Sequence, residues 1–425
     1  MTRRSAHIAD RRSVLRATGG LAVLSTAGCL GDGADGDGDT ESDGDDAPPD
    51  DGDEVEHAVE RVAEGFENPW GLAFLPGDGR LLVTERPGRL SLLDPGPGTV
   101  ESVAGAPEVF AEGQGGLLDV AIHPDYPDDR RVYLTYSASA SGGADGGDPE
   151  RDGATTHVGA GRLDPDAPAL SGFEAVRVAE PFRDTDLHFG SRATFGPDGA
   201  LFVTVGDRRD TEFGPDHVSQ DPSNELGATL RLTPDGDAHP DNPFVDDPDA
   251  SDAVYSYGHR NPQAMAVRPE TGAVWQCEHG EEDGDEINLV ERGGNYGWPI
   301  ASEACRYGTD DPLAPGHDER GDVVAPVHYW PCGSGGFPPS GAVFYDGDAF
   351  PAWRGDLFAG TLAAQYLGRF TVEGAGAAEA DVTERDPLLA DRGWRVRALA
   401  VEPSTGHLYV AVDDADAPVV RLVPA

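Results

Sequence analysis

The chain has 425 residues and a formal net charge of −47, from 78 acidic and 31 basic residues. This charge excludes a general affinity for nucleic acid, because phosphate backbones are bound by a basic stripe. Every basic residue is Arg, and an acidic excess without Lys is typical of adaptation to high salt, which screens self-repulsion.

The first 28 residues have the pattern of an export signal. Arg11 and Arg12 form a twin-arginine motif, an apolar run covers residues 21–27, and Cys29 ends a lipobox. The apolar run is far shorter than the roughly 20 residues that span a bilayer. We therefore expect residues 1–28 to be a twin-arginine lipoprotein signal peptide. Lipid on Cys29 would then hold the protein at the extracellular face of the cell membrane.

An acidic segment follows the signal. Residues 29–56 consist mostly of Gly, Asp, Glu, Ser and Pro, a composition that cannot bury enough apolar surface to offset the entropy of ordering. We expect this segment to be a disordered tether. The remaining residues, 57–425, form the predicted folded domain.

The folded domain contains six copies of one pattern, in which two apolar runs flank a turn rich in Pro, Asp and Gly. The copies are Trp70–Arg86, Leu117–Ser137, Ser191–Asp207, Gln263–Gly280, Ser340–Leu362 and Arg397–Asp413. Each alternates like a β-hairpin, and no segment shows a sustained helical period. This predicts an all-β fold, a six-bladed β-propeller of four-stranded antiparallel blades. Residues 59–62 are expected to close the ring by pairing with residues 419–422.

Polar residues stand just outside the inner strands, and these positions gather at one mouth of a propeller. They are Asn68, Gln114, His188, Arg192, Arg260, Asn261, Arg395 and Arg397. The arginines predict a cationic pocket for an anionic ligand, because Arg donates bidentate hydrogen bonds to carboxylates. The alternative is that each Arg only pairs with a neighbouring carboxylate, such as Glu85 or Asp207.

A dense run of carboxylates follows the fourth hairpin, from Glu278 to Asn288. Its carboxylates and Gly-bent carbonyls suit calcium, which takes six to eight oxygen ligands. In so acidic a chain, a solvated charge run is the alternative. Zinc is disfavoured, because no set of His and Cys has zinc spacing.

Three cysteines lie in the predicted folded domain, so at most one disulfide forms within it. We expect it to join Cys305 and Cys332, which both lie in loop sequence rich in Gly and Pro. Cys277 lies in an apolar strand pattern and is expected to be a buried small hydrophobe.

Several motifs resemble those of the soluble sugar dehydrogenases that use pyrroloquinoline quinone (PQQ), the glucose and aldose sugar dehydrogenase group. The motifs are GQGGLLDVAIHPDY (113–126), LHFGSR (187–192), GHRNPQ (258–263), EHGEEDGDEINLVERGGNYGWP (278–299) and SGAVFY (340–345). The resemblance implies PQQ-dependent oxidation of an aldose at its anomeric carbon to the lactone.

The resemblance also implies roles for particular residues. His188 would be the general base, a task suited to imidazole, whose ordinary pKa is near 6.5. The backbone carbonyls of Gly280 and Glu281 would bind calcium, which polarises the reactive quinone carbonyl. The residues implied to hold the quinone or the sugar are Gln114, Arg260, Asn261, His279, Arg395 and Arg397.

One departure from the family concerns a Lys that usually contacts the quinone after the fifth hairpin, where this chain has Thr361, Leu362 and Ala363. Gln365 is the neighbour that could compensate. A non-catalytic carbohydrate- or protein-binding propeller that has lost the cofactor therefore stays open. A calcium-dependent lactonase fits less well, because its metal site has no need of paired arginines. The particular sugar, the electron acceptor and the choice between monomer and homodimer also stay open.

Overall fold

The computed structural model describes residues 55–140, 153–377 and 379–425, which contain twenty-four β-strands and four short 3₁₀ helices. The predicted signal peptide, Cys29 and the tether up to residue 54 lie outside these ranges, so the lipid anchor stays a prediction. In the described part of the chain, no helix is long and apolar enough to cross a membrane.

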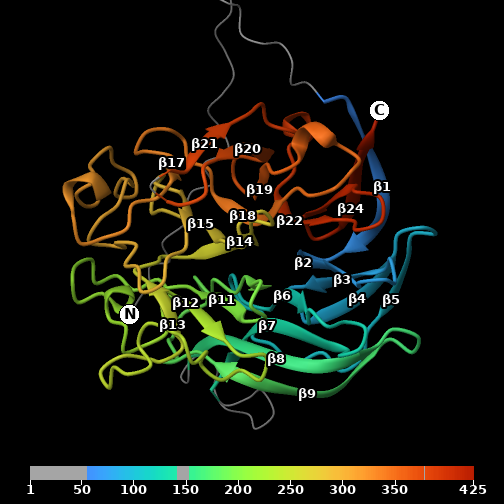
Figure 1. The fold of residues 1–425 in the computed structure, drawn as a ribbon, viewed down its shortest axis with the longest axis horizontal. Helices are drawn as coiled ribbons and strands as arrows, with labels where there is room; N and C mark the ends of the chain where they lie inside the picture. Colours follow the sequence, from blue (N-terminus) through green and yellow to red (C-terminus); the bar gives the residue numbers. More distant parts are fainter. Residues whose placement is uncertain (1–54, 141–152, 378) are drawn as a thin grey trace, which may run out of the picture. The chain divides into compact units, whose positions relative to one another are not determined.

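The strands form six antiparallel four-stranded sheets, which Figure 1 shows as blades around a common centre. The first blade contains β2 (Pro69–Phe74), β3 (Leu81–Glu85), β4 (Arg89–Asp94) and β5 (Thr99–Ser102). The second contains β6 (Leu117–Ile122), β7 (Arg131–Ser139), β8 (Ala154–Asp164) and β9 (Ala169–Val178). The third contains β10 (Ala193–Phe195), β11 (Leu201–Val205), β12 (Ala228–Leu232) and β13 (Val254–Tyr257).

The remaining three blades follow in chain order and confirm the predicted six-bladed propeller. The fourth contains β14 (Pro262–Val267), β15 (Val274–Glu278), β16 (Glu286–Leu289) and β17 (His328–Tyr329). The fifth contains β18 (Pro339–Phe344), β19 (Leu357–Thr361), β20 (Leu367–Glu373) and β21 (Asp381–Glu384). The sixth contains β22 (Val396–Val401), β23 (Leu408–Val412), β24 (Ala417–Pro424) and, from the other end of the domain, β1 (His57–Phe66).

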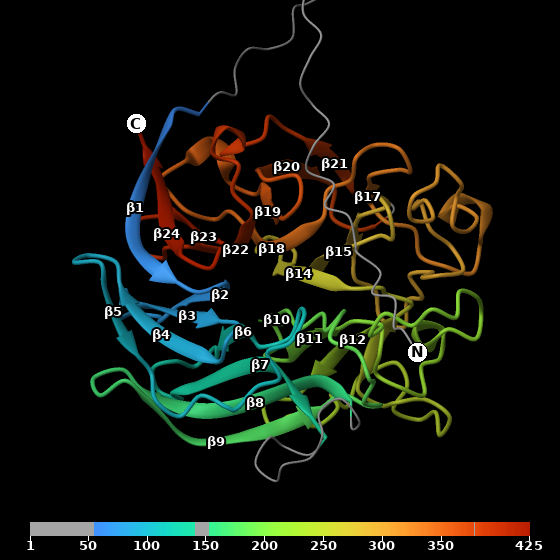
Figure 2. The same ribbon diagram turned by 180° about the vertical axis from the view of Figure 1, so that it is seen from behind.

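The two ends of the domain close the ring, as predicted. β1 pairs antiparallel with β24, with Val59 opposite Leu422, and Figures 1 and 2 show the two strands side by side. The sixth blade then packs on the first, where the rings of Phe74 and Tyr409 meet edge to face at 4.9 Å. Closure by both termini leaves neither of these blades without a neighbour.

Burial explains which strands are inner and which are outer. The second strands of the hairpins, such as β3 and β23, are mostly apolar and are buried along their whole length between neighbouring blades. β5 at the rim is exposed at all four positions. The first strands of neighbouring blades contact one another around the centre, so the residues before them converge at one end.

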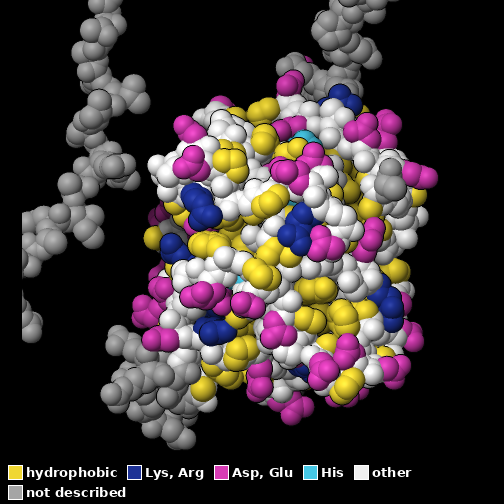
Figure 3. All heavy atoms as spheres, turned by 90° about the vertical axis from the view of Figure 1, so that its left-hand side faces the viewer, with side chains coloured by type: hydrophobic (Ala, Val, Ile, Leu, Met, Phe, Trp, Pro, Cys, Tyr) yellow, Lys and Arg dark blue, Asp and Glu magenta, His cyan; other side chains and the backbone are white. Residues whose placement is uncertain are grey.

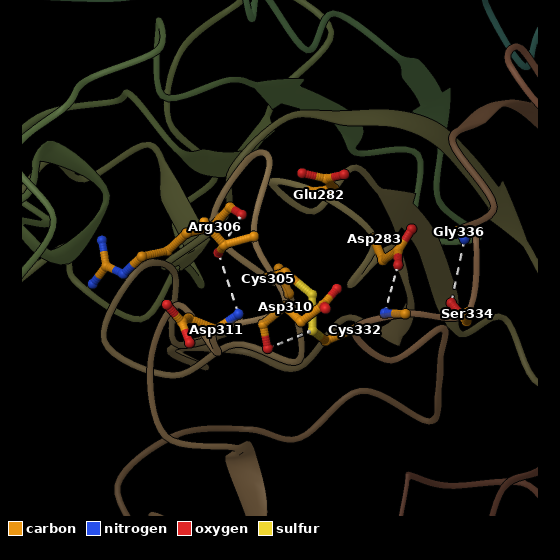
Figure 4. Close-up of a disulfide and its surroundings, with 12 residues drawn as sticks. Glu282, Asp283, Cys305, Arg306, Asp310, Asp311, Cys332, Ser334 and Gly336 are labelled. Atoms are coloured by element: carbon orange, nitrogen blue, oxygen red, sulfur yellow. Dashed lines mark hydrogen bonds between the residues drawn. A yellow bond between two sulfur atoms is a disulfide. The ribbon is translucent and has the colours of Figure 1, made fainter. Parts of the chain in front are cut away.

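The longest connection within a blade joins β16 to β17 and carries part of the disulfide. Cys305 and Cys332 are bonded, as predicted, and Figure 4 shows the bond beside Glu282 and Asp283. Cys277 is the buried free thiol of β15, and burial raises its pKa to about 12. The short helices are η1 (Val218–Gln220), η2 (His317–Glu319), η3 (Pro351–Trp353) and η4 (Ala390–Arg392).

Many acidic side chains of the described residues lie at the surface. On the face drawn in Figure 3, acidic side chains are spread between polar and apolar patches, with scattered arginines among them. Many of the surface arginines pair locally, as Arg320 does with Asp322 at 2.6 Å. Such exposed pairs contribute about 1 kcal/mol or less each.

Candidate active site

Residues next to the inner strands of all six blades line a cavity of about 370 Å³, a size suited to a small organic ligand. All nine site residues named from the sequence line this cavity: Gln114, His188, Arg260, Asn261, His279, Gly280, Glu281, Arg395 and Arg397. The nine residues thus lie together, as expected for polar residues that flank the strands at one mouth of a propeller. Their chemical roles stay predictions.

Two of the other residues expected at the mouth lie elsewhere. Arg192 is buried outside the cavity lining, where its Nη1 donates to Asp119 at 2.9 Å and its guanidinium lies 4.1 Å from the Trp70 ring centre. Trp70 is itself part of the cavity wall. Asn68 donates to Asp413 at 3.2 Å, so it supports a wall residue. Both residues brace the cavity from behind.

His188 is held by its backbone in an unusual conformation. Its φ of 52° lies in the left-handed region, which non-glycine residues adopt mainly where the surroundings enforce it. Its N–H donates to the side-chain oxygen of Gln114 at 2.9 Å, and the N–H of Gly190 donates to that of Asn261 at 3.1 Å. The two predicted amides thus hold the His188 loop through their oxygens, which leaves their NH₂ groups as the donors for a ligand.

A buried carboxylate orients the His188 ring. Nδ1 of His188 lies 2.7 Å from Oδ1 of Asp207, whose oxygens also accept from the Arg209 N–H at 2.7 Å and from Trp298 Nε1 at 2.9 Å. Burial would raise the pKa of Asp207, but the contact with the His188 ring, hydrogen bond included, and the positive charge of Arg260 outweigh burial and lower it. Asp207 is therefore an ionised acceptor, and Nδ1 of His188 carries the proton.

The protonation state of His188 follows from the same contacts. Burial lowers the pKa of His188 below its ordinary value, and Asp207 opposes this shift only in part. The ring is therefore neutral at neutral pH, with Nδ1–H donated to Asp207 and the lone pair on Nε2. A neutral imidazole fixed in this tautomer is what a general base requires.

The lining of the cavity does not have the excess of positive charge that the sequence suggested. It is lined by four arginines and five carboxylates. Arg260 pairs with Glu281, while Arg395 and Arg397 share Asp413 at 3.1 and 2.9 Å. The expectation of a cationic pocket is wrong, because the chain neutralises these arginines with its own acids.

The buried wall nevertheless carries donors without partners. Within the described residues, the Nε–H groups of Arg260 and Arg397 are buried and make no hydrogen bond. Nε2 of His279 also has no partner, but burial and the nearby Arg260 lower the pKa of this ring well below its ordinary value, so the ring is neutral. Its one N–H is used by the Pro339 carbonyl, which leaves Nε2 as an acceptor. Orphaned buried donors cost free energy, and a ligand rich in carboxylate and carbonyl oxygens would satisfy them. The donor set therefore fits a quinone that carries carboxylates.

A tight loop supplies oxygens to the same cavity. A Cβ on Gly280 would lie 1.9 Å from the carbonyl oxygen of Asp283, so only glycine fits the curl of this loop. Asp285 accepts from the Gly280 N–H at 3.1 Å, and burial raises its pKa to about 6. No hydrogen bond among the described residues uses the carbonyl oxygens of Gly280 or Glu281.

These two free carbonyls fit the predicted calcium contacts. The side chain of Glu281 pairs with Arg260 and would contribute charge rather than a direct ligand. Among the residues that the structure describes, no group of three or more His, Cys, Asp or Glu side chains is arranged to hold a metal ion. A calcium ion here would therefore depend on backbone carbonyls, water and the bound ligand.

The segment that lacks the family's Lys contacts the cavity through Leu362. Ala363 and Gln365 are exposed and lie outside the lining, so the structure does not support compensation by Gln365. Arg86 adds a positive charge that the sequence analysis missed. It lines the cavity and donates to the carbonyls of Gly113 and Gly115 rather than to a carboxylate.

Other wall residues were also missed. Arg86 and Asp413 come directly after β3 and β23, so the flanking rule could have found both. Tyr307 comes from the long β16–β17 connection, and no strand pattern points to it. Loops of this length are placed by tertiary contacts that the local sequence does not encode.

Comparison with known proteins agrees with this architecture. The protein family described as "Glucose / Sorbosone dehydrogenase" matches this chain over residues 66–421. The aldose sugar dehydrogenase YliI of Escherichia coli is 37% identical over 371 residues, which cover 86% of this chain and 92% of that protein.

Solved structures give the same result. A crystal structure of a glucose dehydrogenase is 40% identical, covers 87% of this chain and 99% of its own, and has a TM-score of 0.77. The PQQ-bound form of an aldose sugar dehydrogenase from Streptomyces coelicolor is 29% identical, covers 87% and 98%, and has a TM-score of 0.67. The chain described here therefore belongs to the glucose / sorbosone dehydrogenase family.

Proposed function

We propose that this protein oxidises an aldose at its anomeric carbon to the lactone, with PQQ and calcium bound in the cavity. The observation that carries the proposal is the neutral His188 ring, fixed by Asp207 on the wall of a cavity with unpartnered donors. When bound, PQQ would supply the hydride acceptor and calcium the Lewis acid that activates it. The PQQ-bound relative from Streptomyces coelicolor supports this choice of cofactor.

His188 would take the proton from the anomeric hydroxyl. As the O–H bond breaks, the carbon–oxygen double bond of the lactone forms and the C1 hydrogen leaves with its electron pair. Nε2 of His188 accepts the proton, and the charge that develops on the ring is stabilised by Asp207 at 2.7 Å. The general base and its orienting carboxylate are thus supplied by one blade, from the segments before β10 and after β11.

The cofactor would be held by other residues of the cavity wall. Arg260 and Arg397 have unused donors for its carboxylates and carbonyls, and His279 lines the same wall. The free carbonyls of Gly280 and Glu281 would hold calcium. Each charge-assisted hydrogen bond to the cofactor would contribute about 1.5–3 kcal/mol.

The test is the absorption spectrum of the protein mixed with PQQ and calcium at fixed high salt, before and after an aldose is added. We expect PQQ to bind and its spectrum to change to the reduced form on addition of sugar. If PQQ fails to bind, the non-catalytic binding propeller replaces this proposal. If PQQ binds but no aldose reduces it, the oxidation step is wrong while the cofactor assignment holds.

A further inference from the structure

Arg208 is a buried arginine next to the candidate active site that the proposed chemistry does not use. It follows Asp207 in the chain and is 2% exposed, but it does not line the cavity. Burial lowers its pKa to about 9, and the charges of Asp207 and Asp186 oppose this shift only in part. Among the described residues, its guanidinium donates to backbone carbonyls and to no carboxylate. Because a charge without an ion pair is costly to bury, this arginine needs an explanation in the contacts that it makes.

The side chain of Arg208 holds the loop that precedes β10, on both sides of His188. Its Nη1 donates to the carbonyl oxygen of Leu187, and its Nη2 donates to that of Thr185 at 2.6 Å. The backbone N–H of Arg208 donates to the carbonyl oxygen of His188 at 3.3 Å. The guanidinium carbon also lies 3.3 Å from the ring centre of Phe189. One residue thus binds the carbonyls before and at His188 and covers the ring that follows it.

The backbone of His188 requires such support. Its φ of 52° lies in the left-handed region, which a non-glycine residue keeps only where its surroundings determine it. A Cβ on Gly206 would lie 2.2 Å from the His188 carbonyl oxygen, so the loop lies directly against the end of β11. Gln114 and Asn261 accept from N–H groups of this loop, whereas Arg208 donates to its carbonyls. The loop is therefore held through both kinds of backbone group.

We propose that Arg208 is a positioning residue that fixes the backbone of His188 in the conformation needed for proton transfer. The inference rests on the proposed function, because the step affected is the transfer of the sugar's proton to Nε2 of His188. Without Arg208, the carbonyls of Thr185 and Leu187 lose their donors and the left-handed backbone can relax. A displacement of about 1 Å at a reacting group costs roughly 100-fold in rate. Arginine suits this role because its planar fork serves two acceptors at once.

The test compares Arg208→Met with Arg268→Met, since Met keeps much of the apolar volume of the side chain and removes its donors. Arg268 is the matched control, because it also donates to two backbone carbonyls, those of Val372 and Gly374, but lies outside the cavity lining. In protein loaded with PQQ and calcium, Arg208→Met should lower kcat for glucose roughly 10- to 100-fold. KM and PQQ affinity should stay within about threefold. Arg268→Met should keep the kcat of the wild type.

A second measurement needs neither cofactor nor turnover. The Nδ1–H that His188 donates to Asp207 should give a downfield proton NMR resonance in the apoprotein, assigned by its absence in His188→Gln. We expect this resonance to be lost in Arg208→Met, because a released loop lets the proton exchange with water, and to remain in Arg268→Met. If Arg208→Met does not fold, Arg208→Lys replaces it. Its ammonium can serve one carbonyl, so kcat should fall roughly threefold to tenfold.

The outcomes separate positioning from stability and from binding. A folded Arg208→Met protein with the kcat of the wild type, or with an unchanged His188 resonance, would overturn the inference. An equal loss of kcat in Arg268→Met would also overturn it, because the effect would then follow from stability alone. A change confined to KM or PQQ affinity would assign Arg208 to binding instead. If the wild type oxidises no aldose, the proposed function fails, while the resonance still decides whether Arg208 positions His188.

Discussion

Replacing Asp207 by Asn is the sharpest test of the arrangement around His188. The two oxygens of Asp207 accept three hydrogen bonds, from His188, from the Arg209 N–H and from Trp298. An amide has a single oxygen, so its NH₂ must face either the Trp298 N–H or the pair formed by His188 and the Arg209 N–H. The second orientation would force the proton of His188 onto Nε2 and remove the base.

The magnitude follows from the charge that Asp207 supplies. Two unit charges about 4 Å apart interact by about 4 kcal/mol at an effective dielectric constant of about 20. If roughly half of a positive charge develops on His188 in the transition state, the lost stabilisation is about 2 kcal/mol. This corresponds to a fall in kcat of roughly 30-fold, and more if the tautomer inverts.

The assay is turnover of glucose with an artificial electron acceptor, after loading with PQQ and calcium, across pH 4.5–9. Because the Asp207 anion raises the pKa of His188 against the effect of burial, its removal lowers that pKa further. The acid limb of the wild type should therefore lie below about pH 6.5 and move to lower pH in Asp207→Asn. A loss below threefold with an unmoved acid limb would refute the orienting role. Equal PQQ affinity and equal thermal stability of the two proteins would show that the loss is not caused by unfolding.

Three further changes test other parts of the molecule. His188→Gln should lower kcat by roughly 10²- to 10⁴-fold at unchanged PQQ affinity, and near-normal turnover would remove it from the mechanism. Arg397→Ala removes the buried partner of Asp413 and leaves it only the part-exposed Arg395 and the amide of Asn68, so it should lower the free energy of unfolding by about 2–3 kcal/mol in urea titration. The Arg395 side chain is 43% exposed, so Arg395→Ala should lower the free energy of unfolding by about 1 kcal/mol or less. Equal losses of stability in the two variants would contradict the difference in burial between the two arginines. Replacing Cys305 and Cys332 together by Ser should lower the free energy of unfolding by about 3.5 kcal/mol, because the unfolded chain gains the entropy of a 27-residue separation. An unchanged free energy of unfolding would contradict this, since the unfolded chain without the disulfide would then gain no entropy.

Much of the fold could be predicted because each blade repeats the same local signal. Apolar strands around Pro, Asp and Gly turns fix every hairpin, and six hairpins need a radial arrangement to bury both faces. Pairing of β1 with β24 could also be predicted, since two unpaired apolar strands remained at the ends. The placement of the long β16–β17 connection could not, because Tyr307 and Cys305 are positioned by contacts with Glu282, far outside any strand register.

The members of the site were predictable, but their electrostatics were not. A position beside an inner strand identifies which residues face the cavity, since geometry alone sets that relation. It does not identify ion-pair partners, which depend on atomic distances. Glu85 and Asp207 seemed to be the natural partners of the arginines by sequence, whereas the structure pairs Arg260 with Glu281 and Arg397 with Asp413.

This internal pairing suits a chain with a net charge of −47. At molar salt the screening length falls to about 3 Å, so a pocket that attracted an anion by long-range charge would lose most of that attraction. Buried ion pairs such as Arg397 with Asp413, at 2.9 Å, are screened far less and hold the guanidinium in place. Under the proposed function, the ligand would be recognised by the remaining N–H donors at hydrogen-bond distance, an interaction that ions in solution do not reach. Specific binding would then depend on the position of a few donors rather than on the sign of the total charge of the cavity.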